Sequence, residues 1–345
     1  MSAARPSISI VIPCRNEARH IGGLLDAIRQ QDTAILEVVI VDNSTDDTRR
    51  TIDDYCVEHP DLPVRVVPYD GPASIPAAVN MGVRHATGDI IVRLDGHSMP
   101  EHHYVGRAVA ALELEGAGVV GGVWEIAPGA PTASAEAIAS AASHPVGAGD
   151  AAYRIARAGA ERRDVDTVPF GCYRKTLWTE LGGLNEALLS NEDYEFNYRT
   201  HASGRRVILD PGIRSTYYAR ATLGGLAQQY FRYGWWKVQM LRRSPESLRW
   251  RQAVPAAFVA GFAALVSCVA ALAAFAPTSP LLPLAGLALV AILALYVAAL
   301  VAASLQICAR RRAWRMLPFL PVAFATIHFA WGSGALVNLL TGGRR

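Results

Sequence analysis

The stretch Ile90-Ile91-Val92-Arg93-Leu94-Asp95-Gly96-His97 decides the fold of this chain. It begins as an apolar, β-branched run, which is typical of a buried strand, and it ends in an acid, a glycine and a histidine. Gly96 lets the backbone turn tightly where the strand ends. Ligands of α/β sheets bind beyond the carboxyl ends of the strands, where Asp95 and His97 are expected. An acid and an imidazole separated by one residue can bind the same cation, so we interpret the pair as a metal-diphosphate site. The alternative is a solvated loop that carries the same two residues.

Short apolar runs alternate with segments of helical periodicity over the first 125 residues. This alternation predicts an α/β fold, with a Rossmann-like, mostly parallel sheet and helices on both faces. The expected strands are residues 8–12, 36–41, 64–67, 90–94 and 121–124. The expected helices are residues 18–31, 45–59 and 76–86.

The composition changes at residues 125–165, which are rich in Ala, Gly, Ser and Pro. Such a composition is typical of loops, so we expect a flexible loop over the site in which only residues 133–142 are helical. The catalytic domain is then expected to extend over residues 1–222. An amphipathic, aromatic-rich interfacial segment follows at residues 223–251, with Trp235, Trp236 and Lys237 at the depth of the lipid headgroups.

The C-terminal part of the 345-residue chain is strongly apolar. Three segments without charge, 253–276, 281–305 and 317–340, each exceed the roughly 20 residues needed to cross the hydrocarbon of a bilayer. We predict three transmembrane helices within residues 252–345; the alternative is a set of buried helices in a soluble bundle. The third segment is the least typical span because it carries His328 and Asn338.

Basic residues flank these segments unevenly. They precede the first span as Lys237, Arg242, Arg243, Arg249 and Arg251, and lie between the second and third as Arg310, Arg311, Arg312 and Arg315. The positive-inside rule therefore predicts a multi-pass protein of the inner (plasma) membrane with a cytoplasmic catalytic domain. Three spans place the C-terminus outside, and residues 8–12 are too short for the core of a signal peptide. Binding to membrane lipids accounts for the basic clusters, and the net charge of +3 indicates no nucleic-acid partner. The five cysteines are scattered along the sequence, which suggests that their roles are structural.

Three acids follow the second expected strand, in the stretch Asp42-Asn43-Ser44-Thr45-Asp46-Asp47-Thr48. One explanation is helix capping, because Ser, Thr and Asp satisfy the free amides of a first helical turn. A single cap does not require three acids, however, and Asp42 is expected at the strand end that faces the crevice. We therefore predict that Asp42 and Asp46 contact a nucleotide, through a base N–H group or a ribose hydroxyl.

A second acidic group, Glu192-Asp193, begins a later helix. Acids in a first helical turn complement the helix dipole, so each alone is weak support for a site. Beside a metal-diphosphate site, one of these carboxylates becomes a candidate general base for an acceptor hydroxyl. Gln229 and Arg232 are expected on one face of the helix before the membrane, where they could bind a phosphate or an acceptor.

These motifs, in this order, resemble glycosyltransferase family 2 over residues 7 to about 240. The segments that carry the resemblance are residues 11–17, 42–48, 80–82 with 88–89, 95–97 and 192–193. Within the family, the chain is most similar to the succinoglycan-biosynthesis glycosyltransferases of the ExoA type. That closer likeness lies in residues 93–97, 121–124, 143–149 and 166–171 and in the three trailing spans.

The resemblance implies a GT-A fold, an inverting transfer and a divalent metal, Mn²⁺ or Mg²⁺, held by Asp95 and His97. It implies that Asp193 is the catalytic base. The residues that it assigns to the donor nucleotide are Pro13, Asn16, Glu17, Asp42, Asp46, Asn80 and Asp95, and those that it assigns to the acceptor or a phosphate are Glu192, Gln229 and Arg232. The chain departs from the family where His97 replaces an acid of the D-x-D motif and Tyr233 replaces the Trp of Q-x-x-R-W. The Asp42 segment is also one residue shorter, which leaves open whether Asp42 or Asn43 meets the base.

We therefore expect a membrane-bound hexosyltransferase of polysaccharide (exopolysaccharide) biosynthesis. Its donor is a nucleotide sugar, with a UDP-sugar favoured, and its acceptor is a lipid-linked saccharide at the cytoplasmic face. Mn²⁺ should serve at least as well as Mg²⁺, because imidazole suits softer ions than carboxylate does. The alternatives are transfer of one sugar to a polyprenyl phosphate and an inactive membrane-bound sensor or scaffold that binds nucleotide sugars. A processive synthase would need more than three spans.

Overall fold

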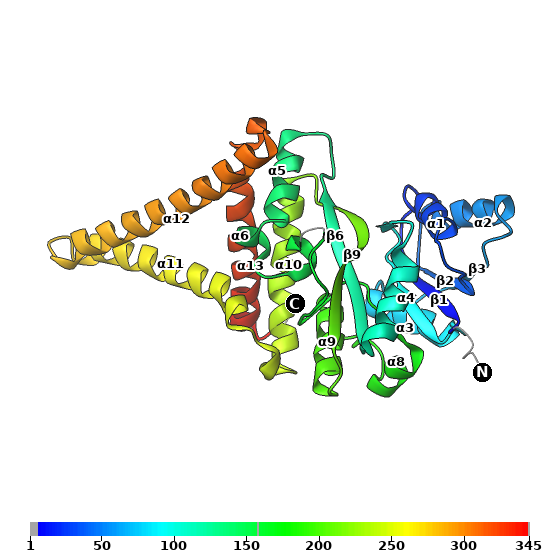
Figure 1. Ribbon diagram of the computed structural model, residues 1–345. Coiled ribbons are helices and arrows are strands. Elements are labelled where there is room, and N and C mark those ends of the chain that lie inside the picture. Colours follow the sequence, from blue (N-terminus) through cyan, green and yellow to red (C-terminus); the bar gives the residue numbers. More distant parts are fainter. Residues whose placement is uncertain (1–5, 157–158, 344–345) are drawn as a thin grey trace. The chain divides into compact units, whose positions relative to one another are not determined.

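The computed structural model describes residues 6–156 and 159–343, and the chain divides into two compact units (Figure 1). The first unit consists of Met1–Glu125 and Ala151–Tyr217. The second consists of Ile126–Asp150 and Tyr218–Arg345. The chain therefore leaves the first unit after residue 125, returns to it, and leaves again after residue 217.

The first unit is built on one sheet with the strand order β3-β2-β1-β4-β8-β6-β9-β5, and β7 pairs with β9. The first four strands pair in parallel, as predicted: β1 (Ile8–Cys14), β2 (Glu37–Asp42), β3 (Val64–Pro68) and β4 (Ile90–Arg93). The remaining strands are β5 (Met99–Pro100), β6 (Val119–Ala127), β7 (Arg163–Asp164), β8 (Cys172–Arg174) and β9 (Val207–Tyr218). Because β8 pairs antiparallel with both β4 and β6, the sheet is mixed rather than mostly parallel.

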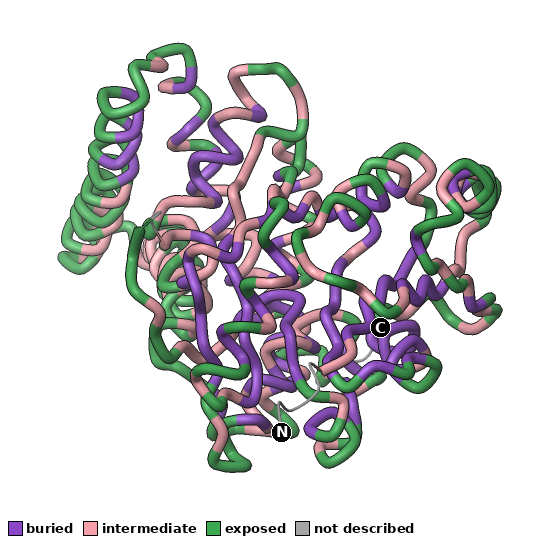
Figure 2. The backbone as a smooth tube through the Cα atoms, turned by 45° about the vertical axis from the view of Figure 1, so that its right-hand side comes forward, coloured by how far each residue is buried: buried purple, intermediate pink, exposed green. Residues whose placement is uncertain are grey.

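Helices cover both faces of this sheet, so every residue of β1 is buried. Ile10 and Ile12 belong to one core with α1 (Ile21–Arg29), α2 (Thr48–Glu58) and α4 (Tyr104–Glu115). Val11, which alternates with them along the strand, belongs to the opposite core with α3 (Ile75–His85), α8 (Lys175–Leu181) and α9 (Glu192–Ala202). Figure 2 shows the central strands as buried segments.

The second unit is helical. It contains α5 (Ala133–Ala142), α6 (Pro145–Ala148), α10 (Leu223–Leu241), α11 (Trp250–Phe275), α12 (Leu281–Arg311) and α13 (Leu320–Thr341). Three of these helices, α11, α12 and α13, are long and apolar enough to cross a membrane, with mean hydropathies of 2.4, 2.7 and 1.4. They correspond to the three predicted spans.

Residues 125–165, expected to be a flexible loop outside residues 133–142, contain more helix than predicted. Residues 133–142 form α5, the one helix expected there, but Ala137, Ile138 and Ala141 are fully buried in a core of the second unit. The short helices α6 and α7 (Ala152–Ile155) follow. The alanines of α5 are small side chains that let this helix pack closely.

The interfacial segment expected at residues 223–251 also differs. Trp235 and Lys237 of α10 are only 4% and 3% exposed, so they lie inside the second unit rather than at a headgroup surface. The Trp235 carbonyl accepts a hydrogen bond from the side chain of Asn338 in α13. Helix α10 therefore packs against α13, which the amphipathic pattern did not indicate.

Two helix glycines provide a test of the packing of the first unit. A Cβ atom at Gly82 of α3 would lie 2.4 Å from Val11 Cγ1, whereas one at Gly22 of α1 would meet nothing within 4 Å. We predict that Gly82→Ala lowers the free energy of unfolding by about 1–3 kcal/mol through overpacking. Gly22→Ala should leave it unchanged or raise it by up to about 1 kcal/mol, because alanine favours helix. Denaturant melts of the two detergent-purified variants measure this, and equal stabilities would contradict the contact between α3 and β1.

Candidate active site

Three parallel strands, β1, β2 and β4, end at the same edge of the sheet. Cys14 lies opposite Asp42, and Val11 lies opposite Arg93. The segments after these strands, residues 15–17, 43–48 and 94–97, therefore all begin at this edge, where α/β sheets bind ligands. The predicted D-x-H pair and the predicted nucleotide-binding segment thus emerge side by side.

Hydrogen bonds join the loops after β1 and β2. Asn16 adopts the left-handed conformation with a φ of 57°, and its backbone N–H donates to Ser44 Oγ at 2.9 Å. The N–H of Thr45 donates to Asn16 Oδ1 at 2.8 Å, and the N–H of Glu17 donates to Thr48 Oγ1 at 2.8 Å. These bonds hold the two loops as one preorganised wall, and they use the Asn16 side chain within the protein.

Asp42 and its neighbour Asn43 differ in what their side chains do. The Asn43 amide donates to the carbonyls of Tyr69 and Gly71, at 2.5 and 3.2 Å, so it ties the loop after β3 to that after β2. Asp42 Oδ1 accepts the N–H of Ser44 at 3.1 Å. Asn43 is therefore committed to the loop, which favours Asp42 as the residue that meets a nucleotide base.

Asp46 lies just before α2. One oxygen of its carboxylate binds a backbone amide of the first helical turn, which is the capping role considered as an alternative to nucleotide binding. Its Oδ1 accepts the N–H of Thr48 at 3.0 Å. The hydroxyl of Thr48 also donates to this carboxylate and holds the pKa of Asp46 below its usual range. The group therefore stays charged at neutral pH.

Glu17 points at the D-x-H loop. Its Oε1 lies 2.8 Å from His97 Nδ1, and its Oε2 lies 3.2 Å from His20 Nδ1. A Cβ atom at residue 96 would lie 2.9 Å from Glu17 Cγ, so Gly96 lets the loop approach this side chain. A carboxylate on one ring nitrogen is the usual partner that orients a metal-binding histidine. The side chain predicted to bind nucleotide is thus engaged with the predicted metal ligand.

Arg93 is the residue around which the acidic groups assemble. It is the last residue of β4, and its side chain is only 3% exposed. Its Nη2 lies 3.1 Å from Asp95 Oδ1 and 3.3 Å from Glu192 Oε1, and its Nη1 donates to Asp193 Oδ1. One guanidinium therefore joins the D-x-H loop to the first turn of α9, about a hundred residues later.

The electrostatics of this cluster favour a base that works near neutral pH. Burial alone would lower the pKa of Arg93, but the charges of Asp193, Asp95 and Glu192 outweigh it and raise the pKa. Burial raises the pKa of Asp193 to about 7, helped by the negative charges of Glu192 and Asp95, although Arg93 opposes the shift. The side chain of Asp193 keeps 27% exposure, against 11% for Glu192. Asp193 is therefore the more accessible carboxylate of the pair.

Asn80 has a structural role. It is buried, and its Nδ2 donates to the carbonyl of Leu184 and to Glu186 Oε1, both at 2.9 Å. Its Oδ1 accepts the N–H of Leu184 at 2.8 Å. These three bonds attach α3 to the turn before α9, so the geometry does not support the predicted contact of Asn80 with a nucleotide.

Three predicted site residues, Pro13, Gln229 and Arg232, are not part of the cluster described around Arg93. Pro13 is buried in β1 opposite Val41. Gln229 and Arg232 lie on α10 in the second unit, Arg232 exposed and Gln229 half-buried. Their assignment to an acceptor or a phosphate stays a prediction. The cysteines are all free thiols, and the burial of Cys14, Cys172 and Cys308 is consistent with structural roles.

Arg93 is not among the site residues predicted from the sequence. The signal was present, because an arginine that ends an apolar strand must find negative partners when it is buried. Which acids serve as partners depends on the tertiary fold, since two of them belong to α9.

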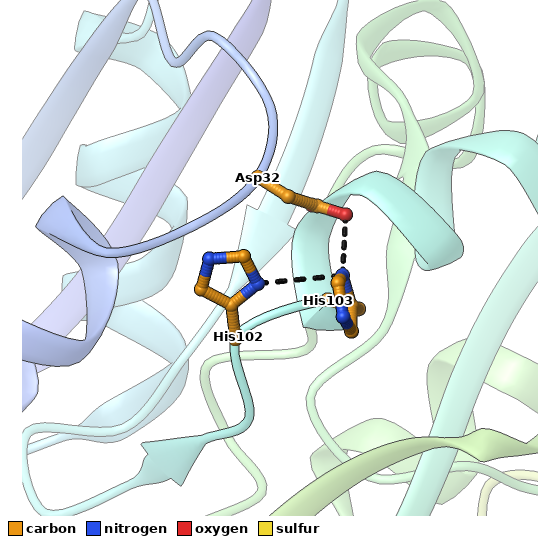
Figure 3. A group of neighbouring side chains, drawn as sticks. All are labelled: Asp32, His102 and His103. Atoms are coloured by element: carbon orange, nitrogen blue, oxygen red, sulfur yellow. Dashed lines mark hydrogen bonds and ion pairs between the residues drawn. The ribbon is translucent and has the colours of Figure 1, made fainter.

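A further group of histidine and acid side chains lies elsewhere on the first unit (Figure 3). Over the described residues, Asp32, His102 and His103 form the one set of three such groups whose ligand atoms all lie within 4.8 Å of one another. His103 Nδ1 lies 2.6 Å from Asp32 Oδ2, and His102 Nδ1 lies 3.4 Å from His103 Nδ1. All three are exposed, and the contact between His103 and Asp32 accounts for their proximity, so we assign the group no function.

Comparisons with known proteins agree with this geometry. The family model described as glycosyl transferase family 2 matches residues 9–173. The succinoglycan biosynthesis protein ExoA of Rhizobium meliloti (strain 1021) is 32% identical over 264 residues, which cover 75% of this chain and 77% of that protein. The dolichyl N-acetyl-alpha-D-glucosaminyl phosphate 3-beta-D-2,3-diacetamido-2,3-dideoxy-beta-D-glucuronosyltransferase of Methanococcus voltae is 26% identical, covering 70% of this chain and 76% of that protein.

Among solved structures, the mannosyltransferase PcManGT from Pyrobaculum calidifontis, in complex with GDP-Man and Mn²⁺, is similar in fold. Its TM-score is 0.61 at 24% sequence identity, and the match covers 95% of this chain and 88% of that one. The mixed sheet, the acidic edge and the extent of the match to ExoA lead to one conclusion: this chain belongs to glycosyltransferase family 2 and is a glycosyltransferase with the GT-A fold.

Proposed function

We propose that this enzyme transfers a sugar, with inversion, from a nucleotide-diphosphate donor to a lipid-linked saccharide. The observation that carries the proposal is the cluster around Arg93, which holds Asp95 of the donor-side loop and Asp193 of α9 at one point. An inverting transfer requires a base for the acceptor hydroxyl and stabilisation of the departing diphosphate. The two carboxylates occupy positions suited to these two tasks.

The donor is proposed to lie along the wall formed by the loops after β1 and β2. Asp42 is the proposed partner of the base, and Asp46 the proposed partner of the ribose. The structural relative PcManGT was solved with GDP-Man, while the family resemblance favours a UDP-sugar for this chain. Asn16 and Pro13 are proposed to shape the wall through the backbone, since the Asn16 side chain already bonds to Thr45.

The residues of the D-x-H loop fit a divalent cation. Asp95 supplies a carboxylate, and His97 supplies an imidazole whose Nδ1 contacts Glu17, the arrangement usual for metal-binding histidines. A cation at these residues would neutralise charge on the donor diphosphate. A mixed oxygen and nitrogen donor set suits Mn²⁺ at least as well as Mg²⁺, and PcManGT was solved with Mn²⁺.

Asp193 is proposed to take the proton of the acceptor hydroxyl as the new glycosidic bond forms. Its raised pKa makes it a stronger base than an ordinary carboxylate, and its partial exposure leaves it accessible. The hydrogen bond from Arg93 Nη1 to Asp193 Oδ1 keeps this carboxylate oriented. Glu192 is more deeply buried and helps to hold the Arg93 side chain in place. We propose that Glu192 affects the acceptor only indirectly, through Arg93.

A lipid-linked acceptor is consistent with a second unit whose helices are long and apolar enough to cross a membrane. The Methanococcus voltae relative is named for transfer to a dolichyl-phosphate sugar, and the Rhizobium meliloti relative for succinoglycan biosynthesis. We place the catalytic unit at the cytoplasmic face of the plasma membrane, because basic residues flank the apolar helices. Gln229 and Arg232 of α10 are proposed to bind the acceptor or its phosphate.

A transfer assay tests this function. Membranes that contain the enzyme are incubated with radiolabelled UDP- and GDP-sugars and with a saccharide on a lipid diphosphate, a polyprenyl phosphate, or neither. The proposal expects label in the lipid-linked saccharide only. Label in the polyprenyl phosphate would show that this lipid phosphate, and not a lipid-linked saccharide, is the acceptor. Nucleotide binding without transfer to any acceptor would indicate a sensor or scaffold.

Replacement of Asp193 tests the base. Asp193→Asn should fold and bind nucleotide as the unsubstituted enzyme does, but lose transfer by about 10²- to 10⁴-fold, the usual contribution of a positioned base. Asp53→Asn is a matched control, because Asp53 is an exposed carboxylate paired with Arg49 on α2. Near-normal turnover of Asp193→Asn would remove Asp193 from the mechanism.

Replacement of Glu17 and His97 tests the cation site. We expect Glu17→Ala to weaken Mn²⁺ binding by about 10- to 100-fold, because His97 loses the carboxylate that orients it. Glu17→Gln should lose less, since its amide oxygen can still accept from the ring. His97→Asp should shift the metal preference toward Mg²⁺, because oxygen ligands favour the harder ion. Electron paramagnetic resonance of free Mn²⁺ measures binding, and unchanged affinity in both Glu17→Ala and His97→Asp would show that the cation binds elsewhere.

A further inference from the structure

The three candidate spans of the second unit differ in how much protein covers them. Over the most apolar window of each helix, the buried share is 0% for α11, 6% for α12 and 39% for α13. Residues 281–299 of α12 include no buried residue, and burial begins at Leu300. That stretch without a buried residue is about 29 Å long at 1.5 Å per residue, close to the roughly 30 Å of a bilayer core. Within it, Tyr296 contacts His328 of α13. The exposed surfaces of α11 and α12 fit lipid, whereas α13 has the largest share of buried residues among the three helices.

Helix α13 lies against α10 in close backbone contact (Figure 1). A Cβ atom at Gly234 would lie 2.0 Å from the Trp331 carbonyl oxygen, and one at Gly334 would lie 2.1 Å from the Phe231 carbonyl oxygen. Only glycine permits this approach from both sides. The two helices therefore form a packed pair, and any placement of α13 in a membrane must also account for α10.

Helix α10 is not suited to the bilayer core. It carries the exposed Arg232, and a charge at the centre of a bilayer is costly. It also precedes the first candidate span and follows β9 directly, so no crossing separates it from the catalytic unit. α10 therefore lies on the catalytic side of the membrane.

Polar contacts hold the C-terminal end of α13 to the end of α10. Asn338 is fully buried, and its Nδ2 donates to the Trp235 carbonyl at 3.1 Å. Arg242 Nη2, at the end of α10, donates to the Asn338 carbonyl at 2.9 Å, and Gln239 Nε2 donates to the Gly343 carbonyl at 3.4 Å. The last turn of α13 thus stays beside residues that precede the first span.

The N-terminal end of α13 is held on the same side. Just before it, Arg315 Nε donates to Glu136 Oε2 of α5 at 3.0 Å, and Met316 Sδ lies 3.6 Å from Ser140 Oγ. Further along, His328 Nε2 lies 2.7 Å from the Val146 carbonyl oxygen. The segment with α5 leaves the first unit after residue 125 and returns to it at residue 151 without a candidate span.

We propose that only the hairpin of α11 and α12 crosses the bilayer, and that α13 and the C-terminus stay on the membrane side that holds the catalytic unit. Both ends of α13 bond to segments of that side, so the helix does not cross. Lipid is then the partner of the uncovered hairpin surface. The basic residues at the end of α12 and just after it, Arg310, Arg311, Arg312 and Arg315, then also lie on that side, as the positive-inside rule favours. A C-terminus on the catalytic side replaces the expected C-terminus outside the cell.

Labelling of introduced cysteines in the full-length protein tests the proposal. The variants are Thr278→Cys between α11 and α12, Leu340→Cys near the end of α13, where the residue is 86% exposed, and Val57→Cys on α2, where it is 82% exposed. Spheroplasts are treated with an impermeant maleimide before and after permeabilisation, and the labelling of the unsubstituted chain is subtracted. Each variant must first keep the melting temperature of the unsubstituted protein.

We expect Thr278→Cys to label on one side of the membrane and both Leu340→Cys and Val57→Cys to label on the other. Labelling of Leu340→Cys on the side of Thr278→Cys would establish three spans and overturn the proposal. Labelling of all three on one side would show that the hairpin does not cross, and protection of Leu340→Cys on both sides would place the end of α13 within the bilayer. Each of these two results overturns the proposal as well. None depends on whether the enzyme transfers a sugar.

Discussion

Arg93 ends a strand that is buried on both faces, and a guanidinium in such a place must be surrounded by negative charge. Asp95, Glu192 and Asp193 supply that charge from two segments far apart in the sequence. Loss of Arg93 itself would cost about 3–5 kcal/mol, because it would leave three clustered carboxylates without a cation. The same cluster sets the pKa of Asp193 and holds the D-x-H loop in position. The stability of this sheet edge and the protonation of Asp193 therefore depend on one set of contacts.

The first unit can be described as a scaffold that brings loops to this cluster. Parallel pairing of β1, β2 and β4 places three loops at one sheet edge, and Glu17 extends the network from the first of them to His97. The second unit supplies a different property, an uncovered apolar hairpin. Three covalent connections, after residues 125, 150 and 217, carry the chain between the two units. The glycosyltransferase fold and the helices that are apolar enough to cross a membrane thus belong to one chain with separate cores.

Sequence patterns predicted the parallel half of the sheet, because apolar runs and helical periodicity depend on local burial alone. They also indicated Asp95, His97 and the Glu192–Asp193 pair as site residues from their positions at element ends, and that assignment stays a prediction. The contacts of Arg93, Glu17 and Asn80 could not be predicted, since each joins residues that only the tertiary fold brings together. Composition predicted the helix at residues 133–142 but not the burial of its alanines, because burial depends on the neighbouring helices. Hydropathy alone likewise could not separate a helix enclosed by protein from one enclosed by lipid.

The pH dependence of transfer tests the central role of this cluster most directly. Because Asp193 must be deprotonated to act as a base, the rate should rise with pH through an apparent pKa of about 7. The negative charge of Glu192 contributes to that raised pKa, so Glu192→Gln should move the rise to lower pH. A profile that is the same in both proteins, or a shift to higher pH, would contradict the account of a base tuned by its neighbouring carboxylate.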